Sequence, residues 1–110
     1  LADFNIVGDC FDRPTGVWVG ESKIAAIGLH ISRGISTHGF ALNVAPDLSY
    51  FDHIVACGLP GSPATSVERE AGISDTTLVS ATLTRHMENI FDWRLQTTTL
   101  EKLVPELTSI

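Results

Sequence analysis

The stretch KIAAIGLHIS (23–32) decides the fold, because it is an apolar run of strand length with a similar run on each side. GVWVG (16–20) precedes it and STHGFALNVA (36–45) follows it. The links Glu21-Ser22 and Arg33-Gly34 are short and polar, as in the turns of β-hairpins. Three strand-like runs joined by such turns predict a three-stranded antiparallel meander.

The second half of the chain has a helical pattern. Thr65-Ser66-Val67-Glu68 has the S/T-x-x-E form of a capping box and predicts a short helix that ends at Gly72. Ser74 or Asp75 is expected to cap a longer helix. One face of that helix would carry Val79, Leu83, Met87, Ile90 and Phe91. A last helical segment is expected from about Thr99. Strands followed by helices predict the α+β class.

Composition excludes several kinds of function. The chain of 110 residues is one domain at most, and its charge of −6 argues against binding to a nucleic-acid backbone. Its longest uncharged apolar stretch, IAAIGLHI (24–31), is too short to span a membrane. The two cysteines and four histidines lack the spacing of metal ligands, so no metal site is expected. The chain begins LADFNIV without an initiator Met, and we expect the natural protein to extend before Leu1.

Three residues are candidates for chemistry, and each has a structural alternative. Cys57, in HIVACGLPG (53–61), is either a small buried residue that closes a strand or a thiol displayed for reaction. Lys23 is either a solvated lysine at a strand start or a partly desolvated amine that exchanges protons with a nucleophile. His38 is either a hydrogen-bonded turn histidine or part of a site.

Each candidate stands next to an apolar strand that glycine interrupts: Lys23 beside IAAIG, His38 beside GFALN and Cys57 beside GLPG. Glycine allows a substrate to approach the backbone and exposes N–H groups to a developing oxyanion. A thiol beside an amine or imidazole is the minimum for acyl transfer through a thioester. The residues alone leave two interpretations open, a cysteine-dependent acyl transferase or hydrolase and an α+β domain without this chemistry.

The motifs themselves resemble a known family. TGVWVGESKIAAIG (15–28), THGFALNV (37–44), DLSYFDHIVACGL (47–59) and TS (65–66) closely resemble the C-terminal half of lipoyl(octanoyl) transferases, in the same order. These enzymes are octanoyl-[acyl-carrier-protein]:protein octanoyltransferases. The resemblance implies an α+β fold with a mixed sheet, similar to lipoate- and biotin-protein ligases. It also implies that 1–110 is the C-terminal portion of one catalytic domain, without the N-terminal half that carries R-G-G and Y-H-x-P-G-Q motifs.

The resemblance also implies a site. By analogy with the family, Cys57 is the nucleophile and Lys23 is its partner. The backbone around Ala26-Ile27-Gly28 and around Gly39-Phe40-Ala41 would line the pocket for the acyl thioester, with His38 beside it. The family works without ATP, metal or another cofactor.

One position departs from the family pattern. Family members commonly have proline immediately before the nucleophilic cysteine, and here Ala56 stands there. The C-G pair that follows is retained, so we interpret Ala56 as a variation rather than a loss of the site.

The implied reaction moves an octanoyl group from acyl carrier protein, through a thioester on the cysteine, to one lysine of a lipoyl domain. The acceptors would be the lipoyl domains of 2-oxoacid dehydrogenase complexes and the H protein of the glycine cleavage system. Two alternatives are a lipoate-protein ligase-like enzyme, which uses ATP and needs no nucleophilic cysteine, and a catalytically silent scaffold that binds lipoyl domains. The expected location is the mitochondrion in a eukaryote, which the VACGL spelling favours, or the cytoplasm in a bacterium.

Overall fold

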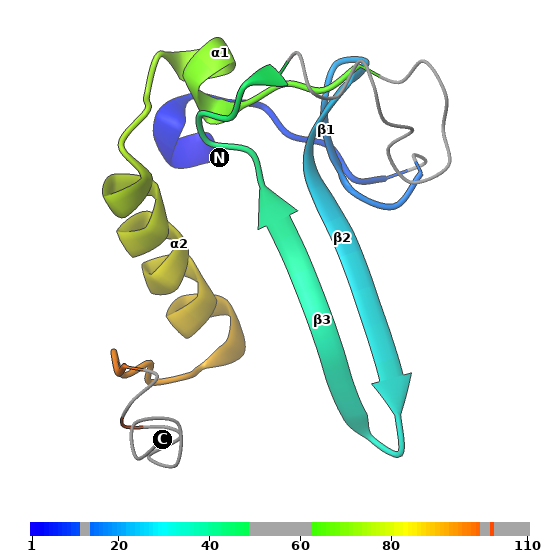
Figure 1. Ribbon diagram of the computed structural model, residues 1–110, viewed down its shortest axis with the longest axis vertical. Helices are drawn as coiled ribbons and strands as arrows, with labels where there is room; N and C mark the ends of the chain where they lie inside the picture. The colour runs from blue at the N-terminus through cyan, green and yellow to red at the C-terminus, as the bar shows by residue number, and fades with distance from the viewer. Residues whose placement is uncertain (12–13, 49–62, 100–101, 103–110) are drawn as a thin grey trace, which may run out of the picture. The chain divides into compact units, whose positions relative to one another are not determined.

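The computed structural model describes residues 1–11, 14–48, 63–99 and 102. Its elements, in chain order, are η1 (Ala2–Phe4), β1 (Val17–Val19), β2 (Ser22–Ser32), β3 (Ile35–Leu42), α1 (Val67–Ala71) and α2 (Thr76–Phe91) (Figure 1). The three strands precede both α-helices, which confirms the predicted α+β class. The chain divides into two compact units, Leu1–Val79 and Ser80–Ile110.

The described strands form one antiparallel sheet in the order β1-β2-β3, which confirms the predicted meander. The third strand is shorter than expected, because it ends at Leu42 and not at Ala45. The carbonyl oxygens of Asn43 and Val44 accept hydrogen bonds from the N–H groups of Val67 and Glu68, the first residues of α1. The chain therefore leaves the sheet at this point, and these two carbonyl groups pair with the first turn of α1 instead of with a strand.

The hydrophobic core of the first unit lies at the end of the sheet where β2 begins. Its buried residues are Ile6, Ile24, Ala25, Val67 and Val79. Ile24 of β2 and Val67 of α1 are completely buried, which fixes α1 against the start of β2. This is also the end of the sheet where Lys23 lies.

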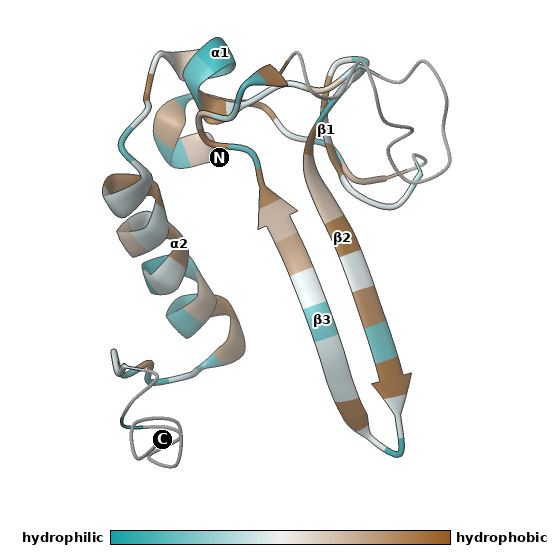
Figure 2. Ribbon diagram, in the orientation of Figure 1, coloured by the Kyte–Doolittle hydropathy of each residue, from teal (hydrophilic) through white to brown (hydrophobic). Residues whose placement is uncertain are grey.

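The far part of the β2–β3 hairpin contributes little to this core. Leu29, Ile31 and Ile35 are each more than 60% exposed, and Phe40 is 48% exposed. Figure 2 shows hydrophobic positions alternating with polar or neutral ones along β2. This period of two is typical of a strand with one apolar face, and the described residues leave that face of the hairpin largely uncovered.

Helix α1 begins one residue later than the predicted capping box. Ser66 is the N-cap, and its Oγ accepts a hydrogen bond of 3.1 Å from the Arg69 N–H. The prediction that Thr65 and Glu68 form the box is wrong, because the Thr65 hydroxyl donates to the Glu70 carboxylate instead. The helix ends at Gly72 as predicted, with φ +72.

Helix α2 is capped by Asp75, the second of the two candidates, whose carboxylate accepts a hydrogen bond of 3.1 Å from the Leu78 N–H. Of the predicted apolar face, Val79 is buried, whereas Ile90 and Phe91 are exposed. Phe91 stacks on Trp93 with 4.6 Å between ring centroids. Nearly all of the segment predicted after Thr99 lies outside the described residues. Within the described part, no helix combines the length and apolar character that crossing a membrane requires.

We predict that Ser66→Ala lowers the free energy of unfolding by about 1 kcal/mol, because it removes the acceptor for one N–H group of the first turn of α1. Ser80→Ala is the matched control, since Ser80 is exposed within α2 and alanine is the better helix former. Urea unfolding of the full-length protein measures both variants. An equal loss of stability in the two would contradict the capping role.

Candidate functional site

Lys23 is the best-defined residue of the predicted site. It stands second in β2 directly opposite Trp18 of β1, and it is only 6% exposed. Its Nζ lies 5.8 Å from the centroid of the Trp18 ring, within range of a cation–π interaction. Lys23 is therefore a buried residue, and the interpretation as a solvated lysine at a strand start is wrong.

A β-bulge turns Lys23 toward one face of the sheet. Trp18 pairs with Lys23, but the preceding residue Val17 pairs with Ala25, so β2 contains one extra residue at this point. Val17 and Trp18 are successive and project from opposite faces, and therefore their partners Ala25 and Lys23 do so too. Lys23 consequently shares a face with Ala26. Bulges next to active sites commonly redirect a side chain in this way.

The backbone of Lys23 is paired on its other side by the segment that follows Cys57 in the sequence. The Lys23 N–H donates to the Pro63 carbonyl oxygen at 3.0 Å, and the Thr65 N–H donates to the Lys23 carbonyl oxygen at 2.9 Å. These bonds form an isolated parallel bridge between Lys23 and Ala64. Cys57 itself, with Ala56, lies outside the described residues.

Asn43 holds the same segment from the end of β3. Its backbone N–H donates to the Ile24 carbonyl oxygen, and its side-chain Nδ2 donates to the Thr65 carbonyl oxygen at 3.1 Å. Residues 63–65 are thus anchored both to the start of β2 and to the end of β3.

The two runs expected to line the acyl pocket lie side by side. Ala26 pairs with Ala41, Ile27 with Phe40, and Gly28 with Gly39. Cross-strand partners share a face, so four small residues form one surface, on the same face as Lys23: Ala26, Gly28, Gly39 and Ala41. No described atom lies within 4 Å of a Cβ built on Gly28 or Gly39. The space above this pair is open among the described residues.

His38 has an unusual backbone. It lies within β3 opposite Leu29, but its φ is +69. This is the left-handed region, which residues other than glycine rarely adopt. Such a conformation costs roughly 1–2 kcal/mol for a residue with a Cβ atom, and strained residues of this kind gather at functional sites. His38 is exposed in the described structure. The sequence does not predict this strain.

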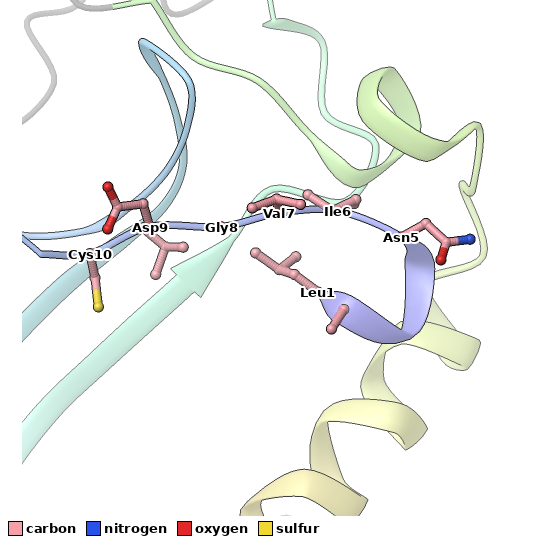
Figure 3. Close-up of a pocket in the computed structure, with 9 residues that line it drawn as sticks. Leu1, Asn5, Ile6, Val7, Gly8, Asp9 and Cys10 are labelled. Atoms are coloured by element: carbon pink, nitrogen blue, oxygen red, sulfur yellow. The ribbon is translucent and has the colours of Figure 1, made fainter.

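A groove of about 650 Å³ lies elsewhere in the first unit. Residues of the segment 1–10, together with Val17, line it (Figure 3). Asp9 and Cys10 lie toward one end of this segment, and Cys10 is an exposed free thiol. Of the residues predicted for the acyl site, none that the structure describes lines this groove. The described residues also contain no group of three His, Cys, Asp or Glu side chains that could hold a metal ion.

Sequence reasoning missed two contributors to the surroundings of Lys23. The first is Trp18, and the second is the backbone of residues 63–65. Trp18 is part of the quoted GVWVG run, but its position opposite Lys23 depends on a register that the bulge changes. The parallel bridge joins residues more than 40 positions apart, and no local pattern predicts such a pairing.

Comparisons with known proteins identify the family of this chain. The family described as the lipoyl protein ligase A/B catalytic domain matches residues 1–92. An octanoyltransferase of Solibacter usitatus is 48% identical over 95 residues, which cover 86% of this chain and 43% of that protein. An octanoyltransferase of Cytophaga hutchinsonii is 42% identical over 106 residues, which cover 90% of this chain and 43% of that protein.

A mitochondrial octanoyltransferase of Arabidopsis thaliana is 56% identical over 66 residues, 60% of this chain and 27% of that protein. Relatives thus include both bacterial and mitochondrial proteins. The chain spans less than half of the length of these curated relatives. The match over residues 1–92 confirms the resemblance inferred from the motifs: the chain belongs to the lipoyl protein ligase A/B catalytic domain family.

Proposed function

We propose that this chain is the C-terminal portion of an octanoyltransferase, which moves an octanoyl group from acyl carrier protein to a lysine of a lipoyl domain. The observation that carries the proposal is the desolvated Lys23, whose backbone is bonded to the segment that follows Cys57. The relatives named octanoyltransferase support the acyl group. Their mitochondrial and bacterial origins fit a mitochondrial location in a eukaryote and a cytoplasmic one in a bacterium.

Covalent geometry limits the distance between the proposed nucleophile and Lys23. Cys57 precedes Pro63 by six positions, and an extended chain covers at most ~3.6 Å per residue. The chain length alone therefore keeps Cys57 within about 22 Å of the Pro63 carbonyl that accepts from Lys23.

The proposed reaction has two steps. First, the Cys57 thiolate attacks the carbonyl carbon of the octanoyl thioester, and the phosphopantetheine thiolate leaves. Lys23 takes the thiol proton and returns one to the departing sulfur. Second, the ε-amine of the acceptor lysine attacks the octanoyl-enzyme thioester, so that an amide forms, the proton lost by the amine passes to Lys23 and the Cys57 thiolate is released. Conversion of a thioester to an amide is downhill and requires no nucleotide.

The small residues of β2 and β3 would guide the acyl chain. Ala26, Gly28, Gly39 and Ala41 form a surface without bulky side chains that starts beside Lys23. An extended acyl chain can approach the backbone closely there, which side chains larger than alanine would prevent. We infer that the chain lies along this face with its carbonyl at the Lys23 end.

The first test is the intact mass of the full-length protein after incubation with octanoyl-acyl carrier protein. We expect a gain of one octanoyl group, removable by hydroxylamine, which is lost in Cys57→Ser. Lys23→Ala should slow its formation by roughly 10²–10⁴-fold, the usual contribution of a positioned acid or base. Cys10→Ser is the matched control, because it removes the other cysteine of the chain and should leave the adduct unchanged.

Other outcomes of this experiment identify the alternatives. A folded protein that forms no adduct, but modifies lipoyl domains when octanoate and ATP are supplied, would be a ligase. A folded protein that binds lipoyl domains and modifies none under either condition would be a scaffold. An adduct that persists in Cys57→Ser would contradict the assigned nucleophile.

Gly28→Val tests the acyl surface. The valine side chain would project into the open space beside Gly39, so we expect unchanged thermal stability and a loss of octanoyl transfer of about tenfold or more. Ser36→Val is the control, because Ser36 pairs with Ile31 and lies on the opposite face of the hairpin. Equal activity in the two variants would argue against an acyl chain on this face.

His38→Gly separates the imidazole from the strained backbone. Glycine adopts φ +69 freely, so this variant should unfold at a urea concentration no lower than that of Thr37→Gly, the neighbouring control. If the imidazole contributes to the site, acyl transfer by His38→Gly falls although its stability is retained. Full activity together with retained stability would remove His38 from the site.

A further inference from the structure

Gly16 lies against the side chain of Lys23. It is buried immediately before β1 and has φ +148, a conformation that residues with side chains rarely adopt. A Cβ built on Gly16 would lie less than 3.0 Å from Lys23 Cε, 3.2 Å from its Nζ and 2.7 Å from the Ala25 carbonyl oxygen. The stem of Lys23 therefore occupies the volume that any side chain at position 16 would need.

Other described glycines with positive φ do not share this contact. Gly20 and Gly34 stand in the turns on either side of β2, with φ +58 and +76. No described atom lies within 4 Å of a Cβ built on either of them. Their turns require only the backbone freedom of glycine, whereas position 16 also requires the empty volume.

Trp18, whose ring lies beside the Lys23 amine, is held in place by several hydrogen bonds. Trp18 is 5% exposed, and its backbone N–H and carbonyl oxygen both bond to Asp9, at 2.7 and 2.8 Å. Its indole Nε1 donates to the Pro14 carbonyl oxygen at 3.0 Å. The ring that faces Lys23 Nζ is thus held through both the backbone and the indole N–H of Trp18. Between this ring and the Gly16 backbone, a flexible lysine stem has little freedom.

We propose that Gly16 is a positioning residue: because it has no Cβ, the Lys23 stem follows one path and its amine is held beside the Trp18 ring. The inference rests on the proposed role of Lys23 in the transfer. A methyl group at position 16 would displace the amine by an ångström or more. A misplacement of that size can reduce the rate of a positioned reaction on the order of 100-fold.

The first experiment measures how accessible the Lys23 amine is. The full-length protein is trace-labelled with acetic anhydride, and the labelling rate of Lys23 is compared by peptide mass with that of Lys102, which is exposed. Gly16→Ala should expose the Lys23 amine and raise its relative labelling by about tenfold or more, since a buried amine reacts only as far as it is accessible. Gly20→Ala, which imposes backbone strain without the contact, should leave the ratio unchanged.

A double-mutant cycle distinguishes positioning from a purely structural role. Lys23→Ala removes the stem, so the loss of stability caused by Gly16→Ala should be clearly smaller in that background. A loss of the same size in both backgrounds would overturn the proposal, because the collision with the Ala25 carbonyl would then explain it. This holds even if Gly16→Ala alone does not fold: recovery of folding in the double variant supports the proposal, and no recovery overturns it.

The kinetic arm links the residue to the reaction. In a folded Gly16→Ala protein we expect the rate of Cys57 acylation to fall on the order of 100-fold, with the dependence on donor concentration little changed. If the unmodified protein forms no adduct, the proposed function fails, but the labelling and stability results still decide whether Gly16 places Lys23. If the adduct forms normally in Gly16→Ala, the function stands and the positioning role fails.

Discussion

Two backbone hydrogen bonds at Lys23 organise the first unit of this protein. They join the start of β2 to residues 63–65, which continue the sheet at the point where β3 has turned away. Together with the bond from the Asn43 side chain to the Thr65 carbonyl oxygen, they fix residues 63–65 to the strands. With them, Thr65, Ser66 and Val67 are buried in succession, and α1 begins against the core. The same contact therefore builds the fold and anchors residues 63–65, which follow Cys57 in the sequence, to the strand that carries Lys23.

Burial of Lys23 is unfavourable in itself, and the surrounding structure offsets that cost. Burial of its apolar stem costs little free energy. The amine, by contrast, loses hydration and needs a favourable interaction in its place. The Trp18 ring supplies a cation–π interaction, a type that contributes about 0.5–2 kcal/mol, more when it is desolvated. A surface lysine would require neither the bulge nor the glycine at position 16. Their presence around one buried amine is easier to explain by chemistry than by stability.

The sequence predicts the local elements well and the site only in part. Alternation in GVWVG and KIAAIGLHIS predicts the strands, and Gly72 and Asp75 predict helix boundaries, since all of these depend on neighbouring residues. The capping box was misplaced by one residue, because Thr65 and Ser66 are both plausible caps and only the pairing with Lys23 and Asn43 selects Ser66. The bulge and the Lys23–Ala64 bridge join distant segments, and no periodicity encodes them. The site residues were predicted by resemblance rather than by pattern.

Among the described residues other than glycine, only His38 has a positive φ inside a strand. Among the described residues, four other than glycine have positive φ: Asn5, Arg33, His38 and Asp92. Asn5 ends η1, Arg33 lies in the hairpin turn and Asp92 follows α2, so three of them serve ordinary chain reversals or helix ends. His38 alone stands inside a strand, where a regular φ would pair equally well. A strain that no turn requires, in the strand that carries the small-residue surface, is what a site residue under geometric constraint would show.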